Sequence, residues 1–287
     1  MIDRKGVWSF LLLTFGLTFI FEGCLIRSGM SMNFGFNSPR PSVYAVVFVA
    51  LAMWIPALST VIVTRFITKE GFGVTNFRFG ALKPYIVSGL IMPVVFAIIY
   101  GLTWLLGLGR PDWQLQSLRE VFAASGRAAM PDSRVLLPAI FFASLVTAPF
   151  INGLFAFGEE FGWRGYLLPK LMPLGKWKAY LLVGIIWGLW HAPLIIAGFN
   201  YPGFPVLGAL AMIGMTTAFG IYINEMTLRS RSSILAAWIH GAFNSQFYGV
   251  WRILFPTAHP LWGGVTGVIG ILVWAAVGVF SVRKDEG

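Results

Sequence analysis

Long apolar segments recur along the whole chain, and they constrain its fold more than any other feature. A helix that crosses a bilayer needs about 20 apolar residues. Eight segments approach this length, and only 11% of all residues are charged, against about 25% in a soluble domain. They cover residues 7–26, 43–64, 85–108, 135–158, 179–197, 206–226, 234–251 and 261–282. The sequence therefore predicts one all-α, polytopic transmembrane domain over residues 1–287, with about eight transmembrane helices.

Lysine and arginine are divided unequally between the two sets of connecting loops. One side carries 14 of the 21 basic residues, including those next to both termini, and the other side carries 7. Because short basic loops stay in the cytoplasm, both termini are predicted to be cytoplasmic. The protein would lie in the cell membrane of a prokaryote or in the endoplasmic reticulum of a eukaryote. Its net charge of +10 is scattered over short loops, which favours contact with anionic lipids and not with nucleic acid.

Two further features limit the possible functions. The single cysteine, Cys24, excludes an intramolecular disulfide and a multi-cysteine metal site. The first apolar segment is too long for a signal peptide and has no small-residue cleavage site after it, so we expect it to remain as a helix. The one sizeable polar connection, residues 109–134, contains DWQLQSLREVFAASG, which predicts a short amphipathic helix at the membrane interface.

Ionisable side chains are costly at membrane depth, at roughly 2.5 to 3.5 kcal/mol each, so each one needs an explanation. Phe157–Leu171, FGEEFGWRGYLLPKL, contains two adjacent glutamates although the chain has only 11 acidic residues. On a helix, Glu160 and Arg164 are four residues apart and can form an ion pair. Glu159 points about 100° away and is expected to face a cavity. The alternative explanation, which involves no function, is that both glutamates lie in head-group water at the end of the helix.

His191 lies well inside the next apolar segment, in GIIWGLWHAPLII. Pro193 removes a backbone donor, which predicts a kink in the helix beside the histidine. Trp187 is one turn earlier on the same face and is expected to pack on the imidazole. The alternative is a histidine that only forms a hydrogen bond between helices.

His240 and Asn244 form a second pair, four residues apart in ILAAWIHGAFNSQF. They share one face of the predicted helix, and small residues around them permit close helix packing. Imidazole and amide groups are hydrogen-bond donors, but they also serve to join helices. On its own, this pair is therefore a weak indication of function.

Together, these side chains predict a catalytic cavity between three segments. Glu159 with His191 could hold and deprotonate a water molecule, because an apolar surrounding strengthens a carboxylate as a base. His240 and Asn244 would donate to the oxyanion that forms on a peptide carbonyl. The same glutamate and histidines could alternatively bind zinc. Against zinc, the chain contains no HExxH motif and no ligand pair at metal spacing on one helix.

Two non-enzymatic functions remain open at this point. Chains of Glu and His also carry protons in transporters, although the sequence lacks the internal symmetry that many transporters have. A membrane scaffold or immunity protein could retain the same residues only to bind a partner.

The three motifs resemble those of the CAAX prenyl protease and bacteriocin-processing family, also called the abortive infection family, which includes the CAAX endopeptidases. EEFGWR, Glu159–Arg164, is similar to its EExxxR motif. WGLWH, Trp187–His191, is similar to FxxxH with tryptophan in place of phenylalanine, and HGAFN, His240–Asn244, is similar to HxxxN. The resemblance covers a motif-bearing core of about residues 135–250.

The resemblance implies eight helices around an intramembrane cavity that opens to the cytoplasm and to lipid. It makes Glu159 the water-activating base with His191, and His240 with Asn244 the oxyanion-stabilising pair. The supporting residues of the site would be Glu160, Arg164 and Trp187.

For the reaction, the resemblance implies a glutamate-type intramembrane endopeptidase without a cofactor or metal. Its substrate would be a prenylated or otherwise membrane-associated peptide, from which the C-terminal tripeptide is removed. Other members of the family process other peptides or serve immunity roles, and the sequence contains no feature specific to a prenyl chain.

Overall fold

The computed structural model describes residues 2–29, 43–124 and 130–283, and within these ranges the chain forms helices and no strand. The predicted all-α fold is confirmed. The helices are α1 (Arg4–Arg27), α2 (Val43–Ala52), α3 (Ile55–Ile62), α4 (Lys83–Leu105), α5 (Gln116–Ala124), α6 (Ser133–Val146), α7 (Ala148–Glu160), α8 (Leu168–Leu171), α9 (Lys176–Trp190), α10 (Ala192–Ile196), α11 (Pro205–Ser230), α12 (Ser233–Gln246), α13 (Arg252–Leu254) and α14 (Val268–Arg283).

Fewer helices than the predicted eight meet the length and hydropathy of a membrane span. In the described part of the chain, four helices are long and apolar enough to cross a membrane, and a fifth span results if α6 and the helical stretch 148–174, bent by 43°, count as one. The count of eight is therefore not confirmed. The apolar segments after residue 174 explain most of the difference, because α9, α12 and α14 have only 15, 14 and 16 residues.

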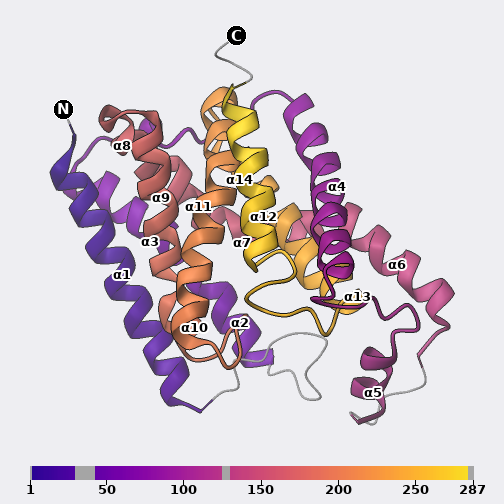
Figure 1. Cartoon of the computed structure of the whole chain (residues 1–287). Coiled ribbons are helices and arrows are strands. Elements are labelled where there is room, and N and C mark those ends of the chain that lie inside the picture. Colours follow the sequence, from indigo (N-terminus) through magenta and orange to yellow (C-terminus); the bar gives the residue numbers. More distant parts are fainter. Residues whose placement is uncertain (1, 30–42, 125–129, 284–287) are drawn as a thin grey trace.

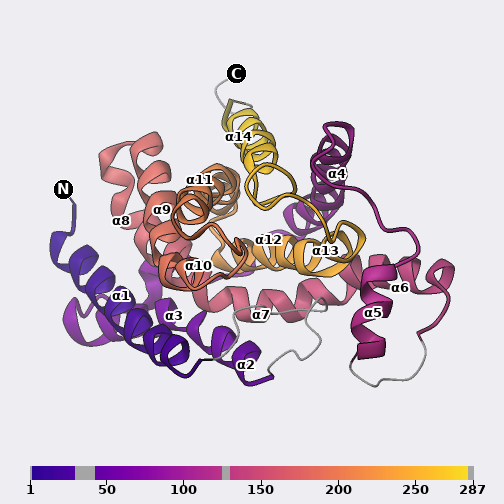
Figure 2. The ribbon, with the colours of Figure 1, turned by 60° about the horizontal axis from the view of Figure 1, so that its bottom comes forward.

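The helices form one bundle in which α7 and α12 lie side by side at the centre (Figure 2). They approach closely because glycines face each other: a Cβ atom on Gly241 would lie 2.4 Å from the backbone nitrogen of Gly153. Helix α11 packs between α9 and α14. The start of α1 and the end of α14 lie at the same end of the bundle (Figure 1).

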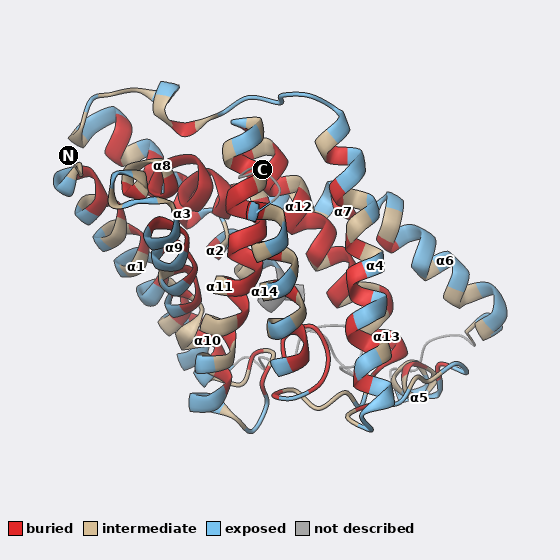
Figure 3. Ribbon diagram, turned by 45° about the horizontal axis from the view of Figure 1, so that its top comes forward, coloured by how far each residue is buried: buried red, intermediate tan, exposed pale blue. Residues whose placement is uncertain are grey.

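The outer and inner helices differ in burial. Helices α11 and α12 are largely buried, whereas α1, α4 and α6 expose one side (Figure 3). The exposed residues of these outer helices include large apolar side chains such as Leu12, Ile20, Leu90 and Val94. An apolar exterior of this kind suits contact with lipid chains.

Two smaller predictions concern the loops. The amphipathic segment forms the nine-residue helix α5, within the sequence stretch that predicted it. Of the basic residues that were counted for the orientation, Arg40, Arg127 and Lys284 lie outside the described residues.

Candidate active site

The site is built around a buried ion pair at the end of α7. Arg164 Nη1 donates to Glu160 Oε1 at 2.9 Å, and both side chains are fully buried. The predicted pair is therefore present. Helix α7 continues after Glu160 as a π-helical segment, Phe161–Leu167, and such π-helical turns are frequent at functional sites.

Other helices supply further partners for this pair. His240 Nδ1 of α12 donates to Glu160 Oε1 at 2.8 Å, and Arg164 Nε donates to Asn224 Oδ1 of α11 at 3.0 Å. Removing two charges from water is expensive, and additional hydrogen bonds are needed to offset that cost. The pair thus joins α7, α11 and α12. Sequence reasoning missed Asn224, although an amide within an apolar helix was a signal available for finding it.

Trp187 of α9 contacts Glu159, Arg164 and both histidines of the site. Its indole Nε1 donates to Glu159 Oε2 at 2.6 Å. The guanidinium carbon of Arg164 lies 4.2 Å from the ring centroid, a cation–π contact. The ring centroids of His191 and His240 lie 5.8 Å and 5.2 Å from that of Trp187. The predicted packing of Trp187 on His191 is confirmed, whereas its hydrogen bond to Glu159 was not predicted.

His191 lies at the break between α9 and α10, where the sequence predicted a kink next to Pro193. Its Nδ1 is 2.8 Å from the carbonyl oxygen of Trp187. A carbonyl oxygen only accepts hydrogen bonds, so Nδ1 carries the proton of this contact. In the neutral imidazole, Nε2 is therefore the nitrogen with a free lone pair.

Four of the predicted site residues line one cavity. Trp187, His191, His240 and Asn244 surround a space of about 60 Å³, which is large enough for at least one water molecule. Glu159 is not part of this lining and is almost completely buried beside Trp187. The expectation that Glu159 itself faces the cavity is thus not met, because the indole N–H holds one of its oxygens.

Two glutamates outside the motifs have different environments. Glu225 of α11 accepts from Tyr180 at 2.7 Å and pairs with Lys176 and Arg229 at 2.8 Å and 2.9 Å. These contacts join the start of α9 to the end of α11. Glu22 of α1 is buried, and neither of its oxygens has a hydrogen-bond partner among the residues that the structure describes. It interacts electrostatically with Glu159.

A protein metal ion is bound by several side chains that lie together. In the part of the chain that the structure describes, no three residues of the types His, Cys, Asp and Glu form such a group. Glu160 is already occupied by Arg164 and His240, and Nδ1 of His191 by a carbonyl group. Cys24 is a free, exposed cysteine of α1.

Comparison with known proteins identifies this part of the chain. Residues 134–246 match the family of Rce1-like proteins, described as type II CAAX prenyl endopeptidases. A segment of 105 residues is 35% identical to the CAAX prenyl protease 2 of Methanococcus maripaludis, covering 34% of this chain and 38% of that protein. The chain thus matches well under half the length of this relative. All predicted site residues lie within the matched range, and in residues 134–246 the chain is similar to the Rce1-like CAAX prenyl endopeptidases.

Proposed function

We propose that this protein is an intramembrane endopeptidase that hydrolyses a peptide bond with a water molecule activated by Glu159 and His191. The observation that carries the proposal is the cavity lined by Trp187, His191, His240 and Asn244, with one oxygen of Glu159 hydrogen-bonded to the indole of Trp187. The cavity is enclosed by apolar helices, and shelter from bulk solvent strengthens the electrostatic interactions inside it.

In the proposed reaction, Glu159 is the base. One carboxylate oxygen accepts the Trp187 N–H, which orients the group, and the second oxygen takes a proton from water. His191 Nε2 accepts the other hydrogen of that water and fixes its position, since Nδ1 is occupied by the Trp187 carbonyl. The water oxygen then forms a bond to the carbonyl carbon of the substrate. When the tetrahedral intermediate collapses, the C–N bond breaks and Glu159 returns the proton to the leaving amine.

His240 and Asn244 stabilise the oxyanion of the tetrahedral intermediate in this proposal. Nδ1 of His240 already donates to Glu160, so Nε2 can donate to the oxyanion only when the ring is an imidazolium. The hydrogen bond to Glu160 holds the imidazole ring in place. Asn244 donates through its amide nitrogen and needs no change of charge. Removal of a single oxyanion donor typically costs a factor of about 10² to 10³ in rate.

An apolar chamber beside the catalytic cavity supports the proposal that the substrate is membrane-associated. Asn244 and Tyr248 belong to the walls of both the catalytic cavity and a second cavity of about 510 Å³. The second cavity is lined mainly by apolar residues, such as Leu136 and Ile140 of α6 and Ile253 of α13. We assign this chamber to the lipid or apolar portion of the substrate. The likeness to CAAX prenyl protease 2 favours a prenylated peptide that loses its C-terminal tripeptide.

The test of this function is cleavage of a farnesylated CAAX-type peptide by the purified protein in detergent, measured by mass spectrometry. We expect release of the C-terminal tripeptide, continued release in the presence of a zinc chelator, and weaker cleavage of the same peptide without the farnesyl group. Absence of cleavage by folded protein would contradict the peptidase proposal. Loss of cleavage with the chelator, restored by zinc, would contradict the glutamate mechanism.

The orientation in the membrane remains the one proposed from charge, with both termini cytoplasmic. The catalytic cavity shares Asn200, Phe247 and Thr266 with a larger cavity, formed by loops at the end opposite to the start of α1 (Figure 1). With cytoplasmic termini, this larger cavity faces the non-cytoplasmic side, whereas the resemblance implied a cytoplasmic opening. The two expectations conflict if the larger cavity is the entrance.

Cysteine labelling in intact cells decides between these orientations. In a Cys24→Ser background, the exposed loop position Thr257 is changed to cysteine and treated with a membrane-impermeant thiol reagent. The charge distribution predicts labelling without cell lysis, and a cysteine at Lys178, at the opposite end, should then be labelled only after lysis. The reverse pattern would overturn the charge-based orientation and place the larger cavity in the cytoplasm.

A further inference from the structure

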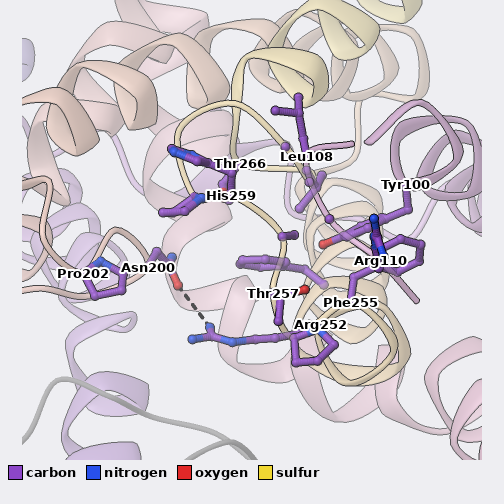
Figure 4. Close-up of a pocket in the computed structure, with 18 of the residues that line it drawn as sticks. Tyr100, Leu108, Arg110, Asn200, Pro202, Arg252, Phe255, Thr257, His259 and Thr266 are labelled. Atoms are coloured by element: carbon purple, nitrogen blue, oxygen red, sulfur yellow. Dashed lines mark hydrogen bonds between the residues drawn. The ribbon is translucent and has the colours of Figure 1, made fainter. Parts of the chain in front are cut away.

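The larger cavity next to the catalytic site has a marked charge bias. It has a volume of about 760 Å³, and its lining, within the described part of the chain, contains Arg110, Arg252 and His259 but no acidic residue (Figure 4). Three of its residues, Asn200, Phe247 and Thr266, also line the catalytic cavity. A cavity with this composition is suited to a small anionic group that is attached to a substrate in the catalytic cavity.

Arg252 is available to bind such a group. Its guanidinium donates a long hydrogen bond of 3.5 Å to Asn200 Oδ1, and it has no carboxylate partner among the described residues. Its guanidinium carbon lies 5.9 Å from the ring centroids of Phe247 and Tyr248, which limits the orientations of the side chain. A guanidinium group held in this way can bind a carboxylate through two parallel hydrogen bonds.

His259 offers a second donor to the same cavity. The backbone N–H of Leu261 donates to His259 Nδ1 at 3.2 Å. Since Nδ1 accepts this bond, the proton of the neutral imidazole is on Nε2. His259 is therefore a hydrogen-bond donor even without a positive charge. Arg110, which is exposed, adds a further positive charge to the wall.

The cavity that Arg252 lines adjoins the catalytic cavity, since the two share Asn200, Phe247 and Thr266. Arg252 itself follows a kink at Gly249, where the backbone is not helical. Three extended residues extend about 10 Å. A substrate whose scissile carbonyl lies at Asn244 can thus place a carboxylate three residues further on in the adjoining cavity that contains Arg252.

We propose that Arg252, assisted by His259 and Arg110, binds the free C-terminal carboxylate of the substrate and so selects cleavage three residues from the chain end. This assignment rests on the peptidase function proposed above. Arg252 lies beyond residue 246, where the family match ends. It is a specificity residue in this proposal and takes no part in the transfer of protons.

The experiment compares two farnesylated peptides that differ only at the C-terminus, one with a free carboxylate and one with a carboxamide. For the wild type we expect kcat/KM to be about 10- to 100-fold higher for the acid, because a charge-assisted bidentate contact is lost with the amide. Arg252→Gln should cleave both peptides at the low rate of the amide. Arg252→Lys, which keeps the charge, should retain part of the preference and also serves if Arg252→Gln folds poorly.

Arg134→Gln is the matched control, because Arg134 is an exposed arginine that does not line this cavity. It should retain the full preference for the acid. Equal cleavage of acid and amide by the wild type would overturn the carboxylate assignment while leaving the peptidase function intact. Cleavage of neither peptide would instead count against the peptidase function itself.

A lipid head group is the competing anion, since the cavity opens at one end of the bundle. We therefore repeat the comparison in vesicles with and without an anionic phospholipid. If Arg252→Gln retains the discrimination between acid and amide but loses a dependence on anionic lipid, the site binds lipid head groups and the proposal is wrong.

Discussion

Replacement of Glu159 by glutamine is expected to reduce kcat for tripeptide release by a factor of about 10² to 10⁴, the range of a lost general base. The amide oxygen of glutamine can still accept the Trp187 N–H that Glu159 accepts now. The side chain then keeps its position but can no longer take a proton from water. The melting temperature in detergent should therefore change little. Both quantities are measured on the same purified sample.

Glu225→Gln is the control for the loss of a buried carboxylate. Glu225 is also buried, but its partners are Lys176, Tyr180 and Arg229, away from the catalytic cavity. This variant should have a lower melting temperature and an unchanged kcat. Normal turnover by Glu159→Gln would show that another group activates the water, and Glu22, which interacts with Glu159, would be the first candidate.

Replacement of Glu160 by alanine is expected to lower the free energy of unfolding by about 3 to 5 kcal/mol. The substitution leaves the Arg164 guanidinium fully buried without its counter-charge, and it also removes the acceptor of His240 Nδ1. Thermal or denaturant unfolding in detergent measures the change. Turnover should fall as well, because His240 loses the hydrogen bond that holds its ring in place.

Two further variants separate charge from packing at this position. Glu160→Gln keeps an oxygen for Arg164 and His240, so its loss of stability should be smaller than that of Glu160→Ala. The double variant Glu160→Leu with Arg164→Met removes both charges and should recover part of the stability, because an apolar pair of similar size avoids the cost of desolvation. If Glu160→Ala is as stable as the wild type, the ion pair does not hold α7, α11 and α12 together.

The amino-acid sequence determined those features that depend on nearby residues and on overall composition. The apolar composition predicted an all-α membrane protein. The spacing of four residues predicted the Glu160–Arg164 pair, and Pro193 predicted the break at His191. Helical geometry fixes which residues share a face within one turn or two. Such features can be read from the chain without knowledge of its packing.

The tertiary structure decided every contact between residues that are far apart in the chain. The Trp187–Glu159, Arg164–Asn224 and His240–Glu160 hydrogen bonds join residues that are 28, 60 and 80 positions apart. Their partners depend on how α7, α9, α11 and α12 pack, and hydropathy contains no information on that packing. For the same reason the sequence placed Glu159 in the cavity, whereas the folded chain holds it beside Trp187. The number of spans also depended on the fold, because breaks within apolar segments divide them into helices shorter than a bilayer crossing.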